Sequence, residues 1–383
     1  MAKILTAQLD LPPDVIDFGA GQPSLHLLPL AWLREAAASR LGDNDPAYLA
    51  YGAMPGDGYF RQVLADYLGG HYQVPVDFEN LFVTGGASQG LDLICTLFSR
   101  PGDTIFVEEP SYFLALRIFA DHGLNVVSLP MDDQGLIVEA IEQKLSQHTP
   151  AFLYTIPTFH NPSSVTLSAE RRNRLVQLSR QHDLVIVADE VYHLLSYAAD
   201  PPPPLASQID RSPVISLGSF SKIMAPGLRL GWIQAGTKLI NRFAGCGLVD
   251  SGGSLNHFTS GVMRSAIELG LLEKQLINLK SVYSRRKIAL SKALRELLPD
   301  SVRFVEPDGG FFIWLEFADT IDTVKMLAAA RQHNVGFLPG IEFSGQNGLK
   351  NYARLSFAYF DVPELEEGAR RLAKVIREYT NDE

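Results

Sequence analysis

The chain has 383 residues, of which 46% are hydrophobic and 20% are charged, so it has the composition of a globular protein, not of a disordered or collagen-like one. A formal net charge of −10 argues against a nucleic-acid-binding surface, which concentrates Lys and Arg, and favours a small-molecule partner. The two cysteines lack metal-ligand spacing and no run of about eighteen apolar residues occurs, so we expect no metal site, no membrane span and a cytoplasmic location.

The N-terminal segment, residues 1–44, is rich in Pro and Gly, and we expect it to pack against the C-terminal part of the chain. It does not read as a secretory signal, because Asp10, Pro12 and Pro13 interrupt the apolar stretch that such a signal needs. Residues 45–284 follow as a predicted large domain.

Within this domain, seven short apolar runs alternate with helical patterns between Leu81 and Gly236. The runs are LFVTGG, TIFVEEP, NVVSLPM, AFLYTIP, LVIVADE, VISLGSFS and LRLGWIQAG. Such alternation is typical of a mostly parallel sheet covered by helices on both faces. The sequence therefore predicts an α/β fold with a seven-stranded sheet.

An apolar stripe from Leu272 to Leu294 predicts a long helix, after which the pattern changes. The remaining chain reads as a strand (FFIWLEF), a helix (TVKMLAAARQHN), a second strand (NYARLSFAYF) and a charged helix from Pro363. Residues 285–383 are therefore predicted to form a smaller α+β domain together with the N-terminal segment.

The stretch LFVTGGASQGLDL carries a strand into small residues and then into an amphipathic helix. Backbone amides at a helix N-terminus, reinforced by the helix dipole, bind phosphate well. The backbone of Gly86, Ala87 and Ser88 is therefore a candidate phosphate anchor, although many turns in α/β proteins look alike.

The stretch LVIVADEVYHLL places an acidic pair at the carboxyl end of a buried strand, where ligands bind in open α/β sheets. Asp189 is a candidate for holding a pyridine nitrogen protonated, so that the ring accepts electrons from a substrate carbanion. Tyr192, on the same side of an expected helix start, could donate a hydrogen bond to the phenolic oxygen of such a ring. The alternative is that the acidic pair only caps that helix.

The sharpest local signal is SFSKIMAPGLRLGW, which begins at Ser219. A lone lysine after a strand is usually a solvated surface residue. Lys222 instead lies in an apolar, glycine-containing stretch with serines at 219 and 221 and an arginine at 229. These neighbours suit a phosphorylated aldehyde, with Lys222 forming a Schiff base while Ser219, Ser221 and Arg229 bind the phosphate.

Together these motifs resemble the fold-type I pyridoxal 5′-phosphate enzymes of the class I/II aminotransferase family. The resemblance extends over nearly the whole chain and includes, in order, FGAGQP, YGAMPGDGYFRQVLADYL, TGGASQGLDL, EEPSY, PTFHNPSS, ADEVY, SFSK, GLRLGW, PDGGFFIW, PGIEF and ARLSFA. Within the family the chain is most similar to the 2-aminoadipate and kynurenine aminotransferase branch.

The resemblance implies further roles around the cofactor. Tyr112 of EEPSY would stack on the ring, and Asn161 of HNPSS would hydrogen-bond its phenolic oxygen beside Tyr192, next to the substrate. Tyr51 would reach the phosphate of a neighbouring subunit, giving a homodimer with shared active sites. Each residue also has an ordinary alternative: a packing tyrosine at a helix start, an Asn-Pro turn and a turn aromatic.

Arg354 lies in the mostly apolar strand YARLSFA, where a guanidinium needs an anionic partner. The resemblance implies that it clamps the substrate α-carboxylate in a bidentate manner, and the alternative is an internal ion pair. Gly21 of FGAGQP would let the backbone approach the same carboxylate, although the neighbouring glycine leaves the register open by one residue.

The implied activity is transfer of an amino group between an L-amino acid and a 2-oxo acid by a ping-pong mechanism through a Lys222 aldimine. Lys222, Asp189 and Tyr192 are the predicted catalytic residues. Two alternatives remain open: other chemistry on the same scaffold (β-elimination, decarboxylation or racemisation), and a cofactor-binding module like the effector half of aminotransferase-like transcription factors.

Overall fold

The computed structural model describes residues 9–381, with side chains described up to Tyr379. Residues 1–8 and 382–383 lie outside it, so part of the stretch that argued against a secretory signal is not among the described residues. Within the described part, no helix has the length and apolarity needed to cross a bilayer.

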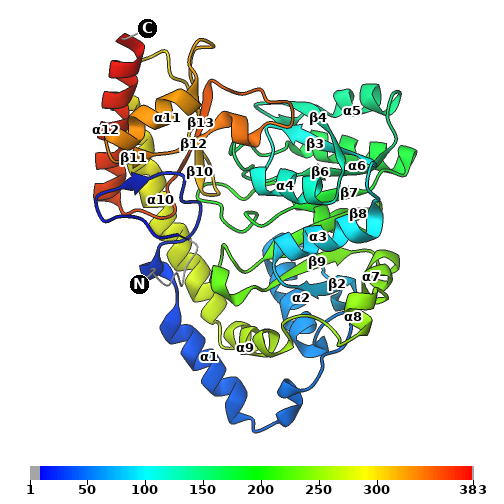
Figure 1. The fold of residues 1–383 in the computed structure, drawn as a ribbon. Coiled ribbons are helices and arrows are strands. Elements are labelled where there is room, and N and C mark those ends of the chain that lie inside the picture. Colours follow the sequence, from blue (N-terminus) through cyan, green and yellow to red (C-terminus); the bar gives the residue numbers. More distant parts are fainter. Residues whose placement is uncertain (1–8, 382–383) are drawn as a thin grey trace, which may run out of the picture.

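A large sheet forms the centre of one half of the molecule (Figure 1). Within residues 9–381 it has eight strands, in the spatial order β2 (Leu81–Thr84), β9 (Gly231–Ala235), β8 (Val214–Ser219), β7 (Ile186–Asp189), β6 (Pro150–Thr155), β3 (Thr104–Glu109), β4 (Asn125–Asp132) and β5 (Gly135–Leu136). Strands β8, β7, β6, β3 and β4 are parallel, whereas β9 runs antiparallel to both of its neighbours.

All seven predicted strands are present, and β5 is the addition. It pairs with the end of β4 through a hairpin whose loop is Asp133 and Gln134. A strand of two residues is too short to show an alternating apolar pattern, so it could not be predicted from the sequence.

Helices cover both faces of this sheet (Figure 1). One face packs against α3 (Ala87–Phe98), α4 (Phe113–Asp121) and α7 (Thr237–Ala244), and the other against α5 (Val138–Leu145) and α6 (Ala169–His182). Ser168 caps α6 through its hydroxyl oxygen, which accepts from the Arg171 amide at 3.3 Å. The same half contains α2 (Gly58–Tyr72), α8 (Gly247–Asp250) and α9 (His257–Glu268).

The other half of the molecule is built around an antiparallel sheet of β10 (Phe312–Glu316), β13 (Tyr352–Ser356) and β12 (Leu338–Pro339). The N-terminal segment joins it, because β1 (Ile16–Asp17) pairs in parallel with β11 (Val335–Gly336). Its helices are α11 (Thr323–Gln332) and α12 (Val362–Asn381), and α1 (Leu30–Gly42) leads from the N-terminal segment toward α9.

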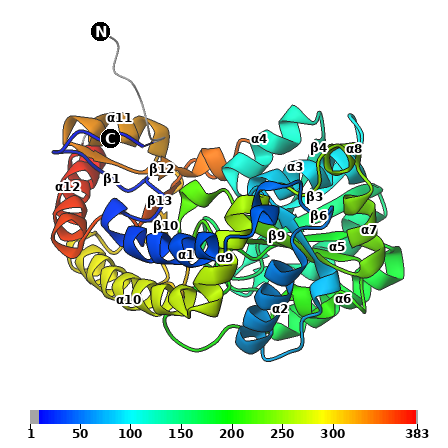
Figure 2. The same cartoon turned by 90° about the horizontal axis from the view of Figure 1, so that it is seen from below.

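The long helix α10 (Leu271–Leu297) runs between the two halves, as Figure 2 shows from below. It packs against α9 at one end and along α12 at the other. The predicted boundary between residues 284 and 285 therefore lies inside a continuous helix, and the division into 1–44, 45–284 and 285–383 stays a prediction. Short 3-10 helices complete the chain: η1 (Leu25–Leu27), η2 (Pro46–Leu49), η3 (Phe78–Asn80), η4 (Leu205–Gln208), η5 (Pro226–Leu228) and η6 (Gly340–Phe343).

Candidate active site

The predicted site residues meet where parallel strands end and the small half faces the large sheet. Asp189 is the last residue of β7, Lys222 follows β8 by three residues, and Asn161 follows β6. Two contacts join these strand ends to the small half: Lys222 Nζ donates to the Gly21 carbonyl at 3.3 Å, and Arg354 Nη1 donates to Asn161 Oδ1 at 2.9 Å. Carboxyl ends of parallel strands are the usual ligand site of such sheets.

Lys222 is a partly buried amine set among aromatic rings. Its Nζ lies 5.8 Å from the centroid of the Tyr192 ring and 5.6 Å from that of Phe311. Burial, assisted by the charge of Arg354 and opposed by Asp189, lowers the pKa of Lys222 to about 8. About a tenth of this amine is therefore neutral at pH 7, far more than for an ordinary lysine, and the neutral form is the one that attacks a carbonyl.

Asp189 is buried, and one of its two carboxylate oxygens accepts a hydrogen bond from a described side chain. Its Oδ2 accepts from the Tyr154 hydroxyl at 2.8 Å, whereas Oδ1 has no hydrogen-bond partner among the described residues. Burial raises the pKa of Asp189 to about 6, against the Tyr154 hydroxyl, the Val191 backbone amide and the charge of Lys222. A buried carboxylate oxygen without a partner is costly, so this atom is suited to a donor supplied by a ligand.

The helix expected after Asp189 does not form. Residues 190–204, all of which the structure describes, contain turns and no helix, so the expected helix start at Tyr192 is wrong. The reason is that Glu190 is used elsewhere: its Oε1 accepts from the Leu205 amide at 2.7 Å and its Oε2 from the Ser216 hydroxyl at 2.8 Å. The capping alternative applies only to Glu190, which accepts from the Leu205 and Ala206 amides at the start of the short helix η4. Tyr192 is nevertheless buried beside Lys222, as its predicted role requires.

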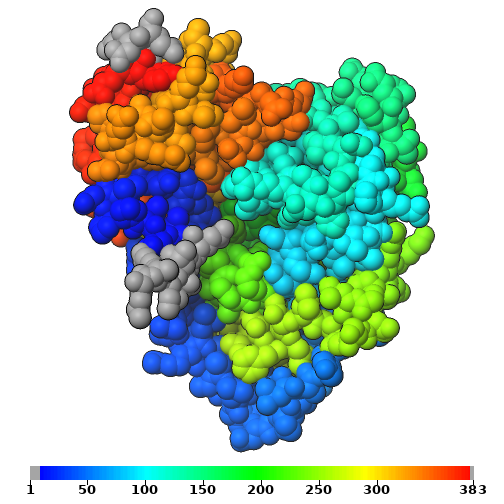
Figure 3. Space-filling model, in the orientation of Figure 1, coloured from blue at the N-terminus to red at the C-terminus, as the bar shows by residue number. Residues whose placement is uncertain are grey.

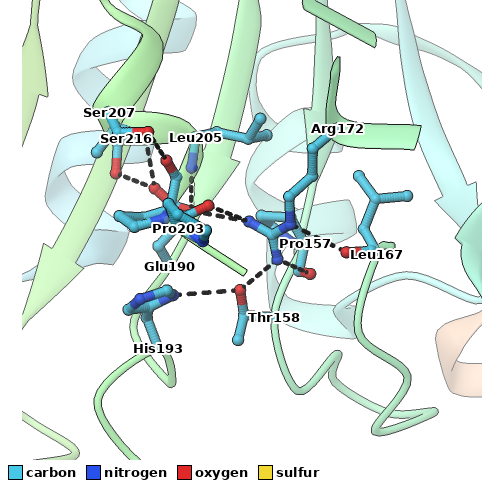
Figure 4. A network of polar contacts seen from close by, with 12 residues as sticks. Pro157, Thr158, Leu167, Arg172, Glu190, His193, Pro203, Leu205, Ser207 and Ser216 are labelled. Carbon is cyan, nitrogen blue, oxygen red and sulfur yellow. Dashed lines mark hydrogen bonds and ion pairs between the residues drawn. The ribbon is translucent and has the colours of Figure 1, made fainter. Parts of the chain in front are cut away.

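A polar network behind this turn fixes its position (Figure 4). The Arg172 guanidinium, 3.8 Å from Glu190, donates to the Pro157 carbonyl at 2.6 Å and to Thr158 Oγ1 at 2.7 Å. Thr158 Oγ1 lies in turn 3.4 Å from His193 Nδ1. The network therefore ties the segment after β6 to the segment after β7, and so holds the two strand ends that carry Asn161 and Asp189 at a fixed distance.

Arg354 is almost fully buried, and the partners of its guanidinium are neutral. Besides Asn161, it donates from Nη2 to the Gly19 carbonyl at 3.1 Å, and it forms no ion pair with any described residue. Its Nε is buried without a partner among the described residues. The described residues therefore form no direct internal ion pair with Arg354, and the Asp17 carboxylate acts on its charge only from a longer distance. A buried guanidinium whose hydrogen-bond partners are neutral is suited to an anionic ligand.

Gly21 lies beside both cations. Its carbonyl accepts from Lys222, and a Cβ placed on it would lie 3.2 Å from Arg354 Nη2. The neighbouring glycine contributes as well, since the Gly19 carbonyl accepts from Arg354. Both glycines of FGAGQP thus contact the charged groups, which explains why the sequence alone could not choose between them.

The start of α3 and the chain after β8 form the candidate binding site for the cofactor phosphate. Gly86 precedes α3 with φ of +91°, and a Cβ placed on it would lie 3.1 Å from Arg229 Nη2. Arg229 also donates to the Gly85 carbonyl at 3.1 Å. Ser219 Oγ accepts from the Ser221 amide at 3.1 Å, so both serines stand in one turn beside Lys222. The helix N-terminus and a guanidinium therefore face the same place.

The remaining predicted residues differ in how they join this cluster. Ala87 and Ser88 are the first residues of α3. Tyr112 lies between β3 and α4, where the charges of Asp189, Arg354 and Arg229 all act on its hydroxyl. Tyr51 does not join it within one chain, because its side chain is 88% exposed.

Sequence reasoning missed two sets of residues near the site. One is Tyr154, whose burial in AFLYTIP required a hydrogen-bond acceptor and could have pointed to Asp189. The other is a group of rings around the Arg354 guanidinium, whose Cζ lies 4.0 Å from the Phe312 centroid, 5.1 Å from Phe343 and 5.8 Å from Phe113. No local spacing connects these three rings, since they come from three distant segments.

The arrangement fits pyridoxal phosphate: a nucleophilic amine, a buried carboxylate oxygen without a donor, a helix N-terminus beside a guanidinium, and a second buried guanidinium for a carboxylate. No cluster of three His, Cys, Asp or Glu side chains placed for a metal occurs among residues 9–381. The amine, the carboxylate and the two guanidinium groups suit an organic cofactor that condenses with amines.

Comparison with known proteins agrees with this geometry. A family model for aminotransferase class I and II matches residues 13–372. The chain is 36% identical to aromatic-amino-acid aminotransferase 1 of Thermococcus litoralis over 95% of its own length and 88% of that protein. The multiple substrate aminotransferase of Thermococcus profundus, 33% identical, has a TM-score of 0.91 and covers 97% of this chain and 93% of its own.

A further solved structure contains a phosphopyridoxyl compound. The α-aminoadipate aminotransferase of Thermus thermophilus, complexed with N-(5′-phosphopyridoxyl)-L-leucine, is 29% identical, with a TM-score of 0.88 over 96% of this chain and 94% of its own. Family, relatives and fold agree with the amine, carboxylate and guanidinium groups found at the strand ends. The chain belongs to the class I and II aminotransferase family, and it is a pyridoxal-phosphate-dependent aminotransferase of fold type I.

Proposed function

We propose that Lys222, Asp189 and Arg354 are the residues through which this chain moves an amino group between an L-amino acid and a 2-oxo acid. The observation that carries the proposal is that all three are charged groups at one buried place, and that Asp189 and Arg354 each keep a polar atom without a partner among the described residues. Bound there, pyridoxal phosphate supplies an aldehyde that condenses with amines and a ring that accepts the electron pair of a broken bond.

Each residue then has one task. Lys222 Nζ would hold the cofactor aldehyde and, once free, would take the proton from the substrate Cα. Asp189 Oδ1 would accept from the pyridine nitrogen of the cofactor, and the Tyr154 hydroxyl keeps that carboxylate oriented. Arg354 holds the α-carboxylate, with Asn161 and Gly21 beside it.

The remaining residues hold the cofactor. The amides of Gly86, Ala87 and Ser88 at the start of α3, with Ser219, Ser221 and Arg229, would bind the phosphate. The approach of Gly86 to Arg229 and the shared turn of Ser219 and Ser221 support this assignment. Tyr112 would pack against the ring, and Tyr192 would donate to its phenolic oxygen.

A half-reaction tests the transfer itself. Incubation of the cofactor-loaded protein with single L-amino acids is expected to convert the cofactor to its pyridoxamine form and to release the matching 2-oxo acid, both measured by absorbance and mass spectrometry. A second 2-oxo acid should restore the original spectrum. Release of ammonia, carbon dioxide or the D-amino acid as the main product would assign a lyase, decarboxylase or racemase, and exchange without any product would assign a regulatory module.

Replacement of Asp189 by asparagine should leave cofactor in the protein and reduce kcat by about 100-fold or more. A neutral amide does not hold the pyridine proton, and leaving a buried charge without its partner costs about 3 to 5 kcal/mol. The measurement is single-turnover kinetics together with the content of bound cofactor. Near-normal turnover would mean that Asp189 does not face the ring nitrogen.

The pKa of Lys222 predicts how cofactor binding depends on pH. Because burial lowers this pKa to about 8, the neutral amine increases about tenfold per pH unit below 8 and levels off above it. The rate at which cofactor-free protein recovers the absorbance of the bound aldehyde should follow this profile between pH 6.5 and 9.5. A rate that keeps rising up to pH 10 or beyond would mean that the lysine keeps its ordinary pKa.

We also propose that the chain is a cytoplasmic homodimer. Large apolar side chains are exposed along residues 25–59 and 248–277, and this much uncovered apolar surface is typical of a subunit interface: Leu25, Leu30, Leu49, Tyr51, Tyr59, Leu248, Phe258 and Ile277. Cys95 and Cys246 are both free thiols, which suits a reducing compartment.

Mixed dimers test whether Tyr51 completes the partner's site. A Lys222→Ala chain combined with a Tyr51→Ala chain should regain about a quarter of wild-type activity after equal mixing, since half of the dimers are hybrids with one intact site. Lys222→Ala mixed with Arg354→Lys serves as the control and should regain nothing, because both residues belong to the same chain's site. Equal results from the two mixtures would place Tyr51 outside the partner's site.

A further inference from the structure

Glu109, the last residue of β3, connects the large sheet to the small half of the molecule. Its Oε2 accepts from the Gly345 amide at 2.9 Å and from the Ser128 hydroxyl at 2.8 Å, and its Oε1 accepts from the Ser344 hydroxyl. Ser128 belongs to β4 of the large sheet, whereas Ser344 and Gly345 follow η6 of the small half. One carboxylate is therefore bound by donors from both halves.

The segment that docks on Glu109 is shaped for this contact. Ser344 Oγ accepts from the Gln346 amide at 3.1 Å and the Gly348 amide at 2.8 Å, so its hydroxyl hydrogen is directed to Glu109. A Cβ on Gly345 would lie 2.6 Å from Ser128 Oγ, so a larger residue could not approach β4 so closely. Figure 3 shows the orange segment around residue 340 resting on the cyan and green surface of the large half.

Phe343, immediately before this contact, is held by it in the candidate substrate site. Its carbonyl accepts from the Ser111 amide at 2.8 Å, and its side chain is fully buried. Its ring lies 5.4 Å from Phe113 and 5.5 Å from Trp314 between centroids, and 5.1 Å from the Arg354 guanidinium carbon. A carboxylate bound to Arg354 would therefore lie next to these rings, with the rest of the substrate within reach of them.

We propose that Glu109 is a positioning residue which docks residues 342–345 on the large half, and that Phe343, seated by this contact, determines specificity for amino acids with large aromatic side chains. The proposal rests on the proposed function, since it takes Arg354 as the carboxylate clamp. Glu109 touches neither substrate nor cofactor in this account. It acts through Phe343, because a displaced 343–345 segment would remove one wall of the aromatic site.

The test compares two substrates on the cofactor-loaded protein, phenylalanine and alanine, in single-turnover half-reactions. The wild-type chain should prefer phenylalanine. Glu109→Gln should lower kcat/KM for phenylalanine by about tenfold or more, because glutamine lacks the negative charge that accepts from three donors. The same variant should change kcat/KM for alanine by less than about threefold. Phe343→Ala should remove most of the preference directly.

Two further variants separate positioning from general damage. Glu342→Gln removes the exposed contact of Glu342 to Arg117 at 3.4 Å in the same segment, and should leave both substrates and the unfolding temperature unchanged. Ser344→Ala removes a single donor to Glu109, and adding it to Glu109→Gln should cause little further loss, because the two side chains act as one contact.

Several results would overturn the proposal: equal losses for both substrates in Glu109→Gln, no loss at all, fully additive losses in the double variant, or a wild-type preference for alanine. A wild-type chain that converts neither amino acid, while retaining cofactor, would instead contradict the proposed function. The two failures are thus distinguishable in one set of measurements.

Discussion

Replacement of Lys222 by alanine should abolish turnover while the protein stays folded and still binds cofactor through its other contacts. Among residues 9–381 the side chain makes one hydrogen bond, to the Gly21 carbonyl, so little packing is lost. Its chemical loss is large, because a positioned general base contributes about 10²- to 10⁴-fold and the covalent hold on the aldehyde disappears as well. We expect a reduction in kcat of at least about 10⁴-fold in steady-state assays.

The matched control is Lys274→Ala, which changes an exposed lysine on α10 and should leave kcat unchanged. Circular dichroism and the total content of bound cofactor should be similar in both variants, with the cofactor held noncovalently only in Lys222→Ala. If Lys222→Ala transaminates at a rate comparable to the control, then Lys222 is not the reactive amine and the assignment of the site is wrong.

Replacement of Arg354 by lysine should depress kcat/KM for amino acids by about 30-fold to several thousand-fold. Losing a bidentate contact to a buried carboxylate costs about 2 to 5 kcal/mol, and an ammonium does not reproduce the guanidinium fork. Burial adds to this effect. It lowers the pKa of Arg354 to about 10, which leaves Arg charged at neutral pH, whereas a lysine in the same place starts from a lower pKa and would lose part of its charge.

An amine substrate without a carboxylate provides the control for Arg354→Lys. It should react slowly with both proteins and show little difference between them, while the absorbance of the bound cofactor stays unchanged. Equal losses for the amino acid and the amine, or loss of cofactor, would show that Arg354 has a structural role and that the carboxylate binds elsewhere.

The sequence predicted most of the large sheet because its strands are long enough and apolar enough to show their pattern. The two-residue β5 was not predicted, because it is too short to show an alternating pattern. The helix expected after Asp189 was wrong for a different reason: Glu190 bonds the start of η4 and Ser216 on β8, contacts between segments that no local pattern reveals. Hydrogen bonds between distant segments outweigh the local preference for a helix at this position.

The same distinction holds for the site. Lys222, Asp189 and the start of α3 were recognisable because each stands at a strand end within a short motif. Arg354 could be singled out by its apolar strand, but only the structure shows that its neighbours Asn161 and Gly19 are neutral. The contact of Glu109 with the segment after η6 joins residues more than 230 positions apart, so no spacing could predict it.

The most direct test of the central claim is to reduce the cofactor-loaded protein with borohydride, digest it and map the modified peptide by mass spectrometry. Reduction makes the bond between the cofactor aldehyde and a lysine amine permanent. We predict one phosphopyridoxyl group per chain, attached to Lys222 in the peptide containing SFSK. Attachment to another lysine, or a protein that keeps cofactor activity without any modified lysine, would contradict it.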